Sequence, residues 1–209
     1  FGAPLVDIAW HCPLMSLPLA FGTALSSIPN AVPYIAPPAE LLAPWRARVG
    51  TASGLKVGLV WQGQPKHRRD RDRSVPPAML ASLAEVPGIR YFALQKRGDG
   101  TGFDELPPAL RQDGLTTDLA QRFADYADTA AAIAALDLVI TVDTSVAHLA
   151  GALGKPVWVL LHKVPDWRWG EAGENAPWYP SARLFRQREP GDWRPVVADL
   201  VAALTALAI

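Results

Sequence analysis

The strongest structural signal in the chain is the stretch DLVITVDTSVAHLAGALGKPVWVLL, residues 137–161. Residues 138–142 are apolar and mostly β-branched, which is typical of a parallel strand covered on both faces. Alanine, leucine and glycine at helical spacing then predict a helix over residues 146–153, and Gly154 is well placed to end it. Residues 157–161 form a second apolar run. The stretch therefore predicts a strand–helix–strand unit, the repeating unit of an α/β fold.

The turn of this unit, Asp143–Thr144–Ser145, is a candidate anion site. It lies at the carboxyl end of a predicted strand, where open α/β sheets bind their ligands. The free N–H groups and the positive dipole end of the following helix suit a phosphate. His148 falls one turn into the helix, close enough to help hold that anion. Alternatively, Asp143 and Thr144 only cap the helix and His148 is a packing residue.

Length and composition limit the classes of protein to consider. The 209 residues allow one large domain, or one domain and a piece of another. The formal net charge of zero argues against broad binding to nucleic acid or to an anionic membrane. The single cysteine, Cys12, excludes an intrachain disulfide and favours a reducing, cytoplasmic location. No apolar run reaches transmembrane length, and the first residues, which lack an initiator Met, suggest a fragment without a signal peptide.

The domain organisation follows from where prolines give way to alternating strand and helix patterns. Residues 1–37 are apolar and rich in proline, with a candidate strand at 6–10, and we interpret them as the end of a preceding domain plus a connector. Residues 38–192 alternate strands and helices, which predicts a doubly wound parallel sheet. Residues 193–209 are predicted to form a closing helix. The predicted elements are a helix at 38–49, strands at 57–61, 89–94 and 182–186, a helix starting at 76–77 and ending near 84, and one or two helices over 118–135.

A basic loop follows the first predicted strand, from Lys66 to Ser74. Its five Lys or Arg residues and two Asp residues leave a local surplus of three positive charges (5 − 2 = 3) in a neutral protein. Such a run is often only a solvated loop. At the carboxyl end of a strand, it is also suited to act as a mobile clamp for a diphosphate.

A tryptophan-rich loop follows the last strand of the opening stretch. It contains Trp167, Arg168 and Trp169. Indole rings beside an Arg can stack on a planar base or on a sugar face. The alternative, slightly favoured for Trp167 and for Trp178 further on, is that the rings fill the side of the core.

The sequence lacks the signatures of several kinds of catalytic and binding site. One cysteine and four scattered histidines show no zinc spacing. The G-x-S-x-G elbow, the Walker A loop and the G-x-G-x-x-G fingerprint are absent. We find no pair of carboxylates that could serve as acid and base. If the protein is an enzyme, this chain holds the donor side of the reaction and not the general base.

Taken together, these motifs resemble a known family. The segments LDLVITVDTSVAHLA and LGKPV resemble the C-terminal domain of the family 9, heptosyltransferase-like glycosyltransferases. The segments VGLVWQGQPKHRRDRDRS, LQK, PDWRW, WYP and RLFRQ are similar to the glycosyltransferase part of bacterial tetratricopeptide-repeat proteins. The resemblance extends from about residue 11 to residue 193.

The resemblance implies a GT-B architecture, in which two Rossmann-like domains face a cleft and the C-terminal one holds most of a nucleotide-sugar donor. This chain would be that C-terminal domain plus the last piece of the N-terminal domain, residues 1–37 with their connector. The N-terminal domain, with the catalytic base and the acceptor contacts, would be mostly outside it, as would any tetratricopeptide repeats. We expect no cofactor and no required metal, because fixed cations and N–H groups can neutralise a diphosphate and no Asp-x-Asp metal motif appears on a suitable loop. The resemblance leaves the catalytic residues, the acceptor and the nucleotide base open.

The donor-site residues are transferred position by position. Asp143, Thr144 and Ser145 match the donor loop of the family, with Ser145 where many members have Gly, and His148 matches its histidine. Arg73 takes roughly the place of a phosphate-binding Lys. With the two loops described above, the predicted donor-binding residues are Trp61, Gln62, Gly63, Lys66, Arg73, Ser74, Gln95, Lys96, Asp143, Thr144, Ser145, His148, Trp167 and Arg168.

The resulting hypothesis is donor-side glycosyl transfer. Arg73, Lys66 and the predicted helix start would neutralise a leaving diphosphate, whose charge grows in the transition state. One alternative is a non-catalytic binding or scaffold domain that kept the fold and lost the transfer reaction. Another is a sugar-nucleotide epimerase of the same architecture, which would need acidic residues lining the cleft of a complete two-domain chain.

Overall fold

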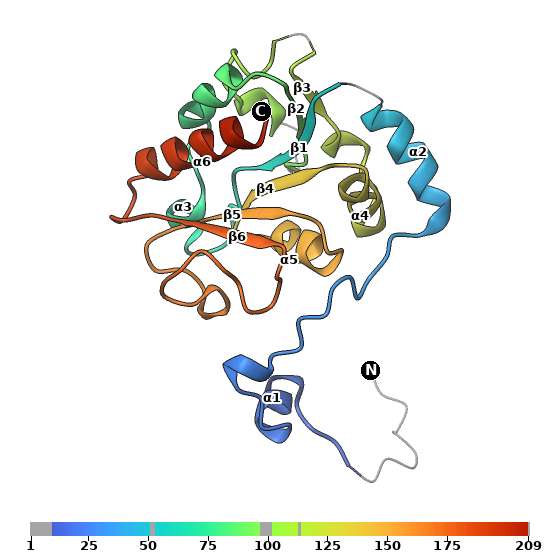
Figure 1. Cartoon of the computed structure of the whole chain (residues 1–209), viewed down its shortest axis with the longest axis vertical. Coiled ribbons are helices and arrows are strands. Elements are labelled where there is room, and N and C mark those ends of the chain that lie inside the picture. Colours follow the sequence, from blue (N-terminus) through green and yellow to red (C-terminus); the bar gives the residue numbers. More distant parts are fainter. Residues whose placement is uncertain (1–9, 51–52, 97–101, 113, 209) are drawn as a thin grey trace.

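The computed structural model describes residues 10–50, 53–96, 102–112 and 114–208. Its centre is a six-stranded sheet with the order β3-β2-β1-β4-β5-β6, and every neighbouring pair of strands is parallel (Figure 1). The strands are β1 (Leu55–Val60), β2 (Ile89–Ala93), β3 (Thr116–Asp118), β4 (Leu138–Val142), β5 (Val157–Leu161) and β6 (Ala182–Arg186). The predicted fold class, a doubly wound α/β sheet of Rossmann type, is confirmed.

The strand order reverses between β1 and β4, which are neighbours in the sheet. The chain first builds outward from β1 to β3 and then starts again at β4 in the other direction. The connections at such a switch point diverge to opposite sides, and the crevice between them is where doubly wound proteins bind ligands.

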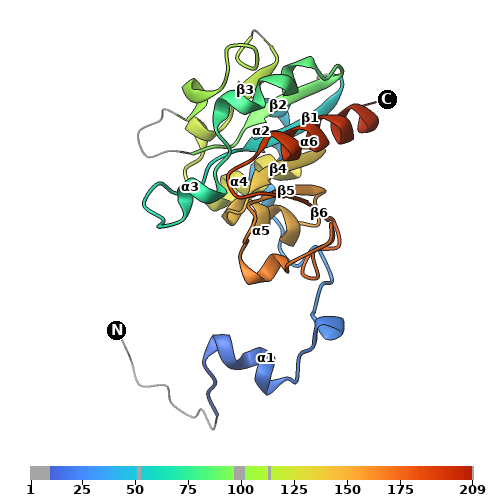
Figure 2. The same cartoon turned by 90° about the vertical axis from the view of Figure 1, so that its left-hand side faces the viewer.

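Helices cover both faces of the sheet. On one face α2 (Ala39–Val49), α4 (Tyr126–Ala134) and α5 (Ser145–Ala152) share a core with alternate residues of the strands. On the other face η3 (Pro77–Glu85) and α6 (Arg194–Leu207) do the same (Figure 2). Because both faces are covered, all five residues of β4 and of β5 are buried, as their apolar runs predicted.

Short elements fill the connections and the amino-terminal segment. They are η1 (Leu14–Ser16), α1 (Leu17–Ala20), η2 (Leu25–Ser27), α3 (Asp70–Arg73), η4 (Phe103–Glu105), η5 (Ala120–Arg122) and η6 (Trp167–Trp169). Among the described elements, no helix is both long and apolar enough to cross a lipid bilayer.

The element predictions were mostly right, and the differences have local causes. Helix α5 starts one residue earlier than predicted, at Ser145, and Gly154 follows it with a φ of +68°. Strand β3 was missed because it is three residues long and reads Thr-Thr-Asp, which carries no apolar pattern. The segment Pro77–Glu85 is a 3₁₀ helix, with i→i+3 hydrogen bonding, where an ordinary helix was expected.

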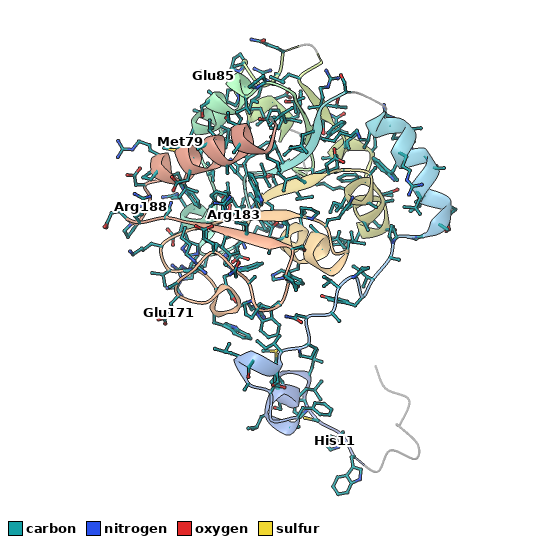
Figure 3. The ribbon with its side chains drawn as sticks, in the orientation of Figure 1. His11, Met79, Glu85, Glu171, Arg183 and Arg188 are labelled. Carbon is teal, nitrogen blue, oxygen red and sulfur yellow. The ribbon has the colours of Figure 1, made fainter. Side chains whose placement is uncertain are left out.

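The N-terminal arm, residues 10–38, extends away from the domain (Figure 3). It is attached near the end of α5, where Tyr34 N–H donates to the carbonyl oxygen of Ala152 over 3.0 Å and Val32 packs on the core. Exposed apolar side chains stand along it, including Leu14 and Phe21. Most of the strand predicted at 6–10 lies outside the described residues, and the assignment of residues 1–37 to another domain stays a prediction.

Candidate functional site

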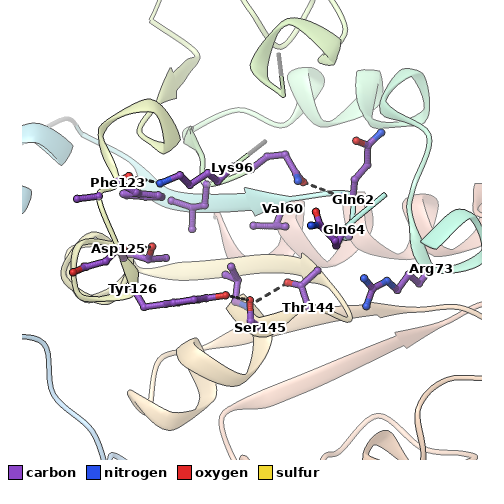
Figure 4. Close-up of a pocket in the computed structure, with 16 residues that line it drawn as sticks. Val60, Gln62, Gln64, Arg73, Lys96, Phe123, Asp125, Tyr126, Thr144 and Ser145 are labelled. Atoms are coloured by element: carbon purple, nitrogen blue, oxygen red, sulfur yellow. Dashed lines mark hydrogen bonds between the residues drawn. The ribbon is translucent and has the colours of Figure 1, made fainter. Parts of the chain in front are cut away.

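A cleft of about 640 Å³ opens at the switch point between β1 and β4. Its walls come from the ends of β1 and β2, the starts of α4 and α5, and the basic loop at α3 (Figure 4). Seven of the predicted donor-site residues line it: Gln62, Gly63, Arg73, Gln95, Lys96, Thr144 and Ser145. The fold therefore brings together half of a set that was predicted from four separate parts of the sequence.

The start of α5 forms one wall of the cleft. Thr144 is the N-cap, and its hydroxyl oxygen accepts a hydrogen bond from Val146 N–H over 3.3 Å. The Ser145 hydroxyl is exposed to the cleft and lies 2.8 Å from the Tyr126 hydroxyl. An exposed helix start offers N–H donors and a positive dipole end to a bound anion.

Arg73 reaches the cleft from the basic loop and is held in place on three sides. Its Nε donates to Asp70 Oδ1 over 3.2 Å, and its Nη1 donates to the carbonyl oxygen of Asp143 over 3.0 Å. The third side is Gly63, where a Cβ atom would lie only 2.2 Å from Asp70 Oδ1 and 2.4 Å from Arg73 Nη2. The guanidinium thus packs directly against a backbone that has no side chain, next to the start of α5.

The basic loop closes on itself at its base. Gly63 N–H donates to the Ser74 hydroxyl over 3.1 Å, and Val75 N–H donates to the carbonyl oxygen of Trp61 over 2.8 Å. Ser74 therefore ties the loop and is not itself among the residues that line the cleft. Lys66 is exposed on the loop and does not line the cleft.

The carboxyl end of β2 contributes Gln95 and Lys96. The buried Gln95 accepts hydrogen bonds at Oε1 from Trp61 N–H and Gln62 N–H, so its amide connects β2 to the start of the basic loop. Lys96 Nζ donates to the carbonyl oxygen of Phe123. Figure 4 shows Lys96 and Arg73 at opposite ends of the cleft, so a ligand lying along it meets a cation at each end.

Trp61 contributes only its backbone to this region. The side chain is 1% exposed and packs in the core formed by η3, α6 and the sheet. A direct contact between its indole ring and a ligand in the cleft is therefore not available in this structure.

His148 lies one turn beyond Ser145 and is not among the residues that line the cleft. Its ring stacks on Trp169, with centroids 5.1 Å apart and planes at 19°, and Nδ1 lies 3.1 Å from the Tyr179 hydroxyl. Burial lowers the pKa of His148, although the nearby Asp143 carboxylate opposes the shift. The ring is therefore held mainly in its neutral form near pH 7.

The tryptophan-rich loop after β5 splits into an outer and an inner part. Trp167 is 63% exposed, with the Arg168 guanidinium 4.9 Å from its ring centroid and Arg168 Nη1 2.8 Å from Asp166 Oδ1. Trp169 is 1% exposed and fills the core beside α5. The core-filling role that we favoured for Trp167 is thus wrong, because Trp169 fills the core instead. The same prediction is confirmed for Trp178, which is half-buried and packs against that core. Neither Trp167 nor Arg168 lines the cleft.

The sequence reasoning missed the wall opposite the basic loop. In all, the sequence analysis did not single out nine of the residues that line the cleft: Val60, Gln64, Leu94, Phe123, Ala124, Asp125, Tyr126, Thr129 and Val146. Most of the missed wall follows β3, the strand that carries no apolar pattern. One signal was present: Asp125 precedes a helical pattern, and its carboxylate caps α4 by accepting from Ala127 and Asp128 N–H.

Within the described parts of the chain, no group of three or more His, Cys, Asp or Glu side chains is placed to hold a metal ion. The positive charge at the cleft comes from Arg73, Lys96 and the start of α5.

Comparison with known proteins shows a family match and a shared fold. Residues 96–195 match the model of glycosyltransferase family 9 (heptosyltransferase). Protein FlbA of Caulobacter vibrioides is 31% identical over 183 residues, which is 85% of this chain and 30% of that protein.

Two solved structures share the fold. E. coli ADP-heptose lps heptosyltransferase II superposes with a TM-score of 0.58 at 17% identity, over 88% of this chain and 57% of that one. E. coli heptosyltransferase WaaC with ADP gives 0.53 at 15% identity, over 86% and 53%. The chain thus spans under a third of FlbA and little more than half of each heptosyltransferase. Residues 96–195 match a glycosyltransferase family 9 domain, and the fold is the Rossmann-like α/β fold found in those heptosyltransferases.

Proposed function

We propose that the cleft binds a nucleoside diphosphate sugar and that this chain supplies the donor-binding part of a glycosyltransferase. The observation that carries the proposal is the convergence of Arg73, Lys96 and the start of α5 on one cleft at the switch point of the sheet. The family 9 match of residues 96–195 supports the reaction class. The two E. coli proteins that share the fold are an ADP-heptose lps heptosyltransferase and a heptosyltransferase with ADP, which makes an adenine nucleotide the first donor to test.

In this proposal the diphosphate lies against Thr144, Ser145 and Arg73. The helix start offers N–H and hydroxyl donors there, and the Arg73 guanidinium is already oriented by Asp70 and by the Asp143 carbonyl. As the glycosyl bond breaks, negative charge grows on the leaving diphosphate. Donors that are fixed before the reaction stabilise that charge at little reorganisation cost.

The neutralising charges come from side chains and backbone, so the proposed reaction needs no metal ion and no other cofactor. The ribose and the base then extend toward Gln95, Lys96 and Phe123, where the cleft continues. A volume of about 640 Å³ falls in the range of small-molecule sites.

The binding test is isothermal titration calorimetry of this chain with ADP, GDP, UDP and CDP. We expect one of the four, ADP first, to bind. The variants Asp143→Ala, His148→Ala and Arg73→Ala are each expected to weaken its binding. Unchanged affinity in all three would remove the site assignment, and no binding of any of the four would remove the donor proposal.

Transfer itself requires a second test on a longer protein that contains the facing domain. Release of nucleoside diphosphate from a nucleotide sugar, dependent on an acceptor, would support the enzyme. Tight nucleotide binding without any transfer would favour the alternative, a non-catalytic binding or scaffold domain. The acceptor, the tetratricopeptide repeats and the cytoplasmic location stay predictions.

A further inference from the structure

Tyr179 lies outside the cleft and contacts helix α5 at His148 and Gly151. It is 7% exposed, and its hydroxyl lies 3.1 Å from Nδ1 of His148. Its ring lies flat against α5 at Gly151, where a Cβ atom would come within 2.4 Å of the ring. The absence of a side chain at Gly151 therefore sets how closely Tyr179 approaches the helix that carries His148.

A second aromatic ring, that of Trp169, also holds the His148 ring. Trp169 stacks on it, and the backbone of that loop is fixed by one guanidinium. Arg186 on β6 donates to the carbonyl oxygens of Trp169, of Gly170 over 3.0 Å and of Gly173 over 2.7 Å. The imidazole contacts both aromatic rings, which also contact each other with centroids 6.4 Å apart, and each of the two rings is held from outside the cleft.

Tyr179 has a second polar neighbour in the N-terminal arm. Burial raises its pKa, and a hydrogen bond with Tyr34 raises it further, so the phenol stays protonated at neutral pH. Tyr34 is anchored in turn by its N–H bond to Ala152 at the end of α5. The Tyr179 hydroxyl is therefore part of a chain that runs from Tyr34 to His148.

We propose that Tyr179 is a positioning residue, whose hydroxyl engages Nδ1 of His148 and leaves Nε2 as the ring nitrogen available to a ligand bound at the start of α5. Nε2 has no hydrogen-bond partner among the residues that the structure describes. The hydrogen bond made by one ring nitrogen decides how the other is presented. The role of His148 in contacting a donor rests on the proposed function. The positioning of the His148 ring by Tyr179 does not.

The first experiment needs no nucleotide. In ¹⁵N-histidine-labelled protein, the four histidines are resolved by long-range ¹H–¹⁵N NMR, and His148 is assigned from the spectrum of His148→Gln. Tyr179→Phe removes only the hydroxyl and keeps the ring against Gly151. We expect the Nδ1 resonance of His148 to shift, with a much smaller change at Nε2. The matched control is Tyr126→Phe, which removes the hydroxyl bonded to Ser145 on the same helix and should leave His148 unchanged.

An unshifted Nδ1 resonance in Tyr179→Phe, or an equal shift in Tyr126→Phe, would overturn the proposal. Circular dichroism of each variant verifies that it is folded. Because no ligand is present, this result stands even if none of the four nucleotides binds.

The second experiment is a double-mutant cycle on ADP affinity. Loss of one hydrogen bond predicts that Tyr179→Phe weakens ADP binding about fivefold in the natural sequence. In a His148→Gln background, Tyr179→Phe should have no further effect, because Tyr179 acts through His148. Independent losses in the two backgrounds would show a general structural role and overturn the positioning role. If wild type binds no ADP while Nδ1 shifts as expected, the donor proposal fails and the hold on His148 remains.

Discussion

The loop after β1 and the loop after β5 begin at the same edge of the sheet, yet only the first lines the cleft. In the basic loop Arg73 points inward because Asp70, Gly63 and the Asp143 carbonyl hold it there. In the tryptophan-rich loop Trp169 is inserted into the core and Trp167 is left in solvent. A position at the carboxyl end of a strand therefore gives a side chain access to a ligand site, and packing and hydrogen bonds determine whether it reaches one.

The two loops also differ in what their central residues stabilise. Arg73 is held by part-buried polar contacts that fix a charge beside the start of α5. Trp169 contributes buried area to the core and a stacking partner to His148. Substitutions in the first loop should therefore reduce binding, and those in the second should reduce stability.

The largest expected effect is on stability in the tryptophan-rich loop. Trp169→Ala should lower the free energy of unfolding by about 3–5 kcal/mol, because it leaves a cavity in the core beside α5. The matched control Trp167→Ala should change it by less than about 0.5 kcal/mol, because that ring is exposed. Urea denaturation of the two variants measures both values. Similar losses would contradict the division of this loop into an inner and an outer part.

The next effect distinguishes two cations of the basic loop. Arg73→Ala should weaken ADP binding by about 1.5–3 kcal/mol, the usual contribution of charge-assisted hydrogen bonds. Lys66→Ala should have a much smaller effect, because Lys66 is exposed and does not line the cleft. Calorimetry on both variants decides the matter. A larger loss for Lys66→Ala would mean that the loop closes over the nucleotide as a mobile clamp.

A smaller effect tests how Arg73 is held. In Gly63→Ala the new methyl group would overlap Asp70 Oδ1 and the guanidinium, so the pair must move. We expect ADP affinity to fall roughly tenfold, or about 1.4 kcal/mol. In an Arg73→Ala background the same change should have no further effect. A full additional loss there would show that Gly63 acts on the nucleotide directly.

The smallest effect is the pH dependence of stability. Burial lowers the pKa of both His148 and His162 in the folded protein. Below the unfolded value of about 6.5 the unfolded chain therefore binds more protons than the folded one. Stability should fall as the pH drops below that value. Thermal unfolding at pH 7.5 and 5.5 measures the loss, which His148→Gln should reduce; an equal loss in wild type and variant would contradict the assignment to His148.

Much of the fold could be predicted from the sequence, because parallel strands covered on both faces require continuous apolar runs. The residues of β4 and β5 carry that pattern, and the helix between them has a polar cap at its start and Gly154 after its end. Strand β3 escaped because a three-residue edge strand buries too little to need an apolar pattern. Because β3 was missed, the sequence analysis also missed the cleft wall around Phe123 and Tyr126, which follows that strand.

For the candidate site, the sequence identified the polar turn at Thr144 and the basic loop because their chemistry is local: capping side chains next to an apolar strand, and a surplus of charge. The direction of each side chain depends on contacts between residues far apart in the chain. Arg73 meets the Asp143 carbonyl, and His148 meets Tyr179, only after the sheet has formed. Local pattern thus predicts which residues lie near the switch point, and long-range packing selects those that face the cleft.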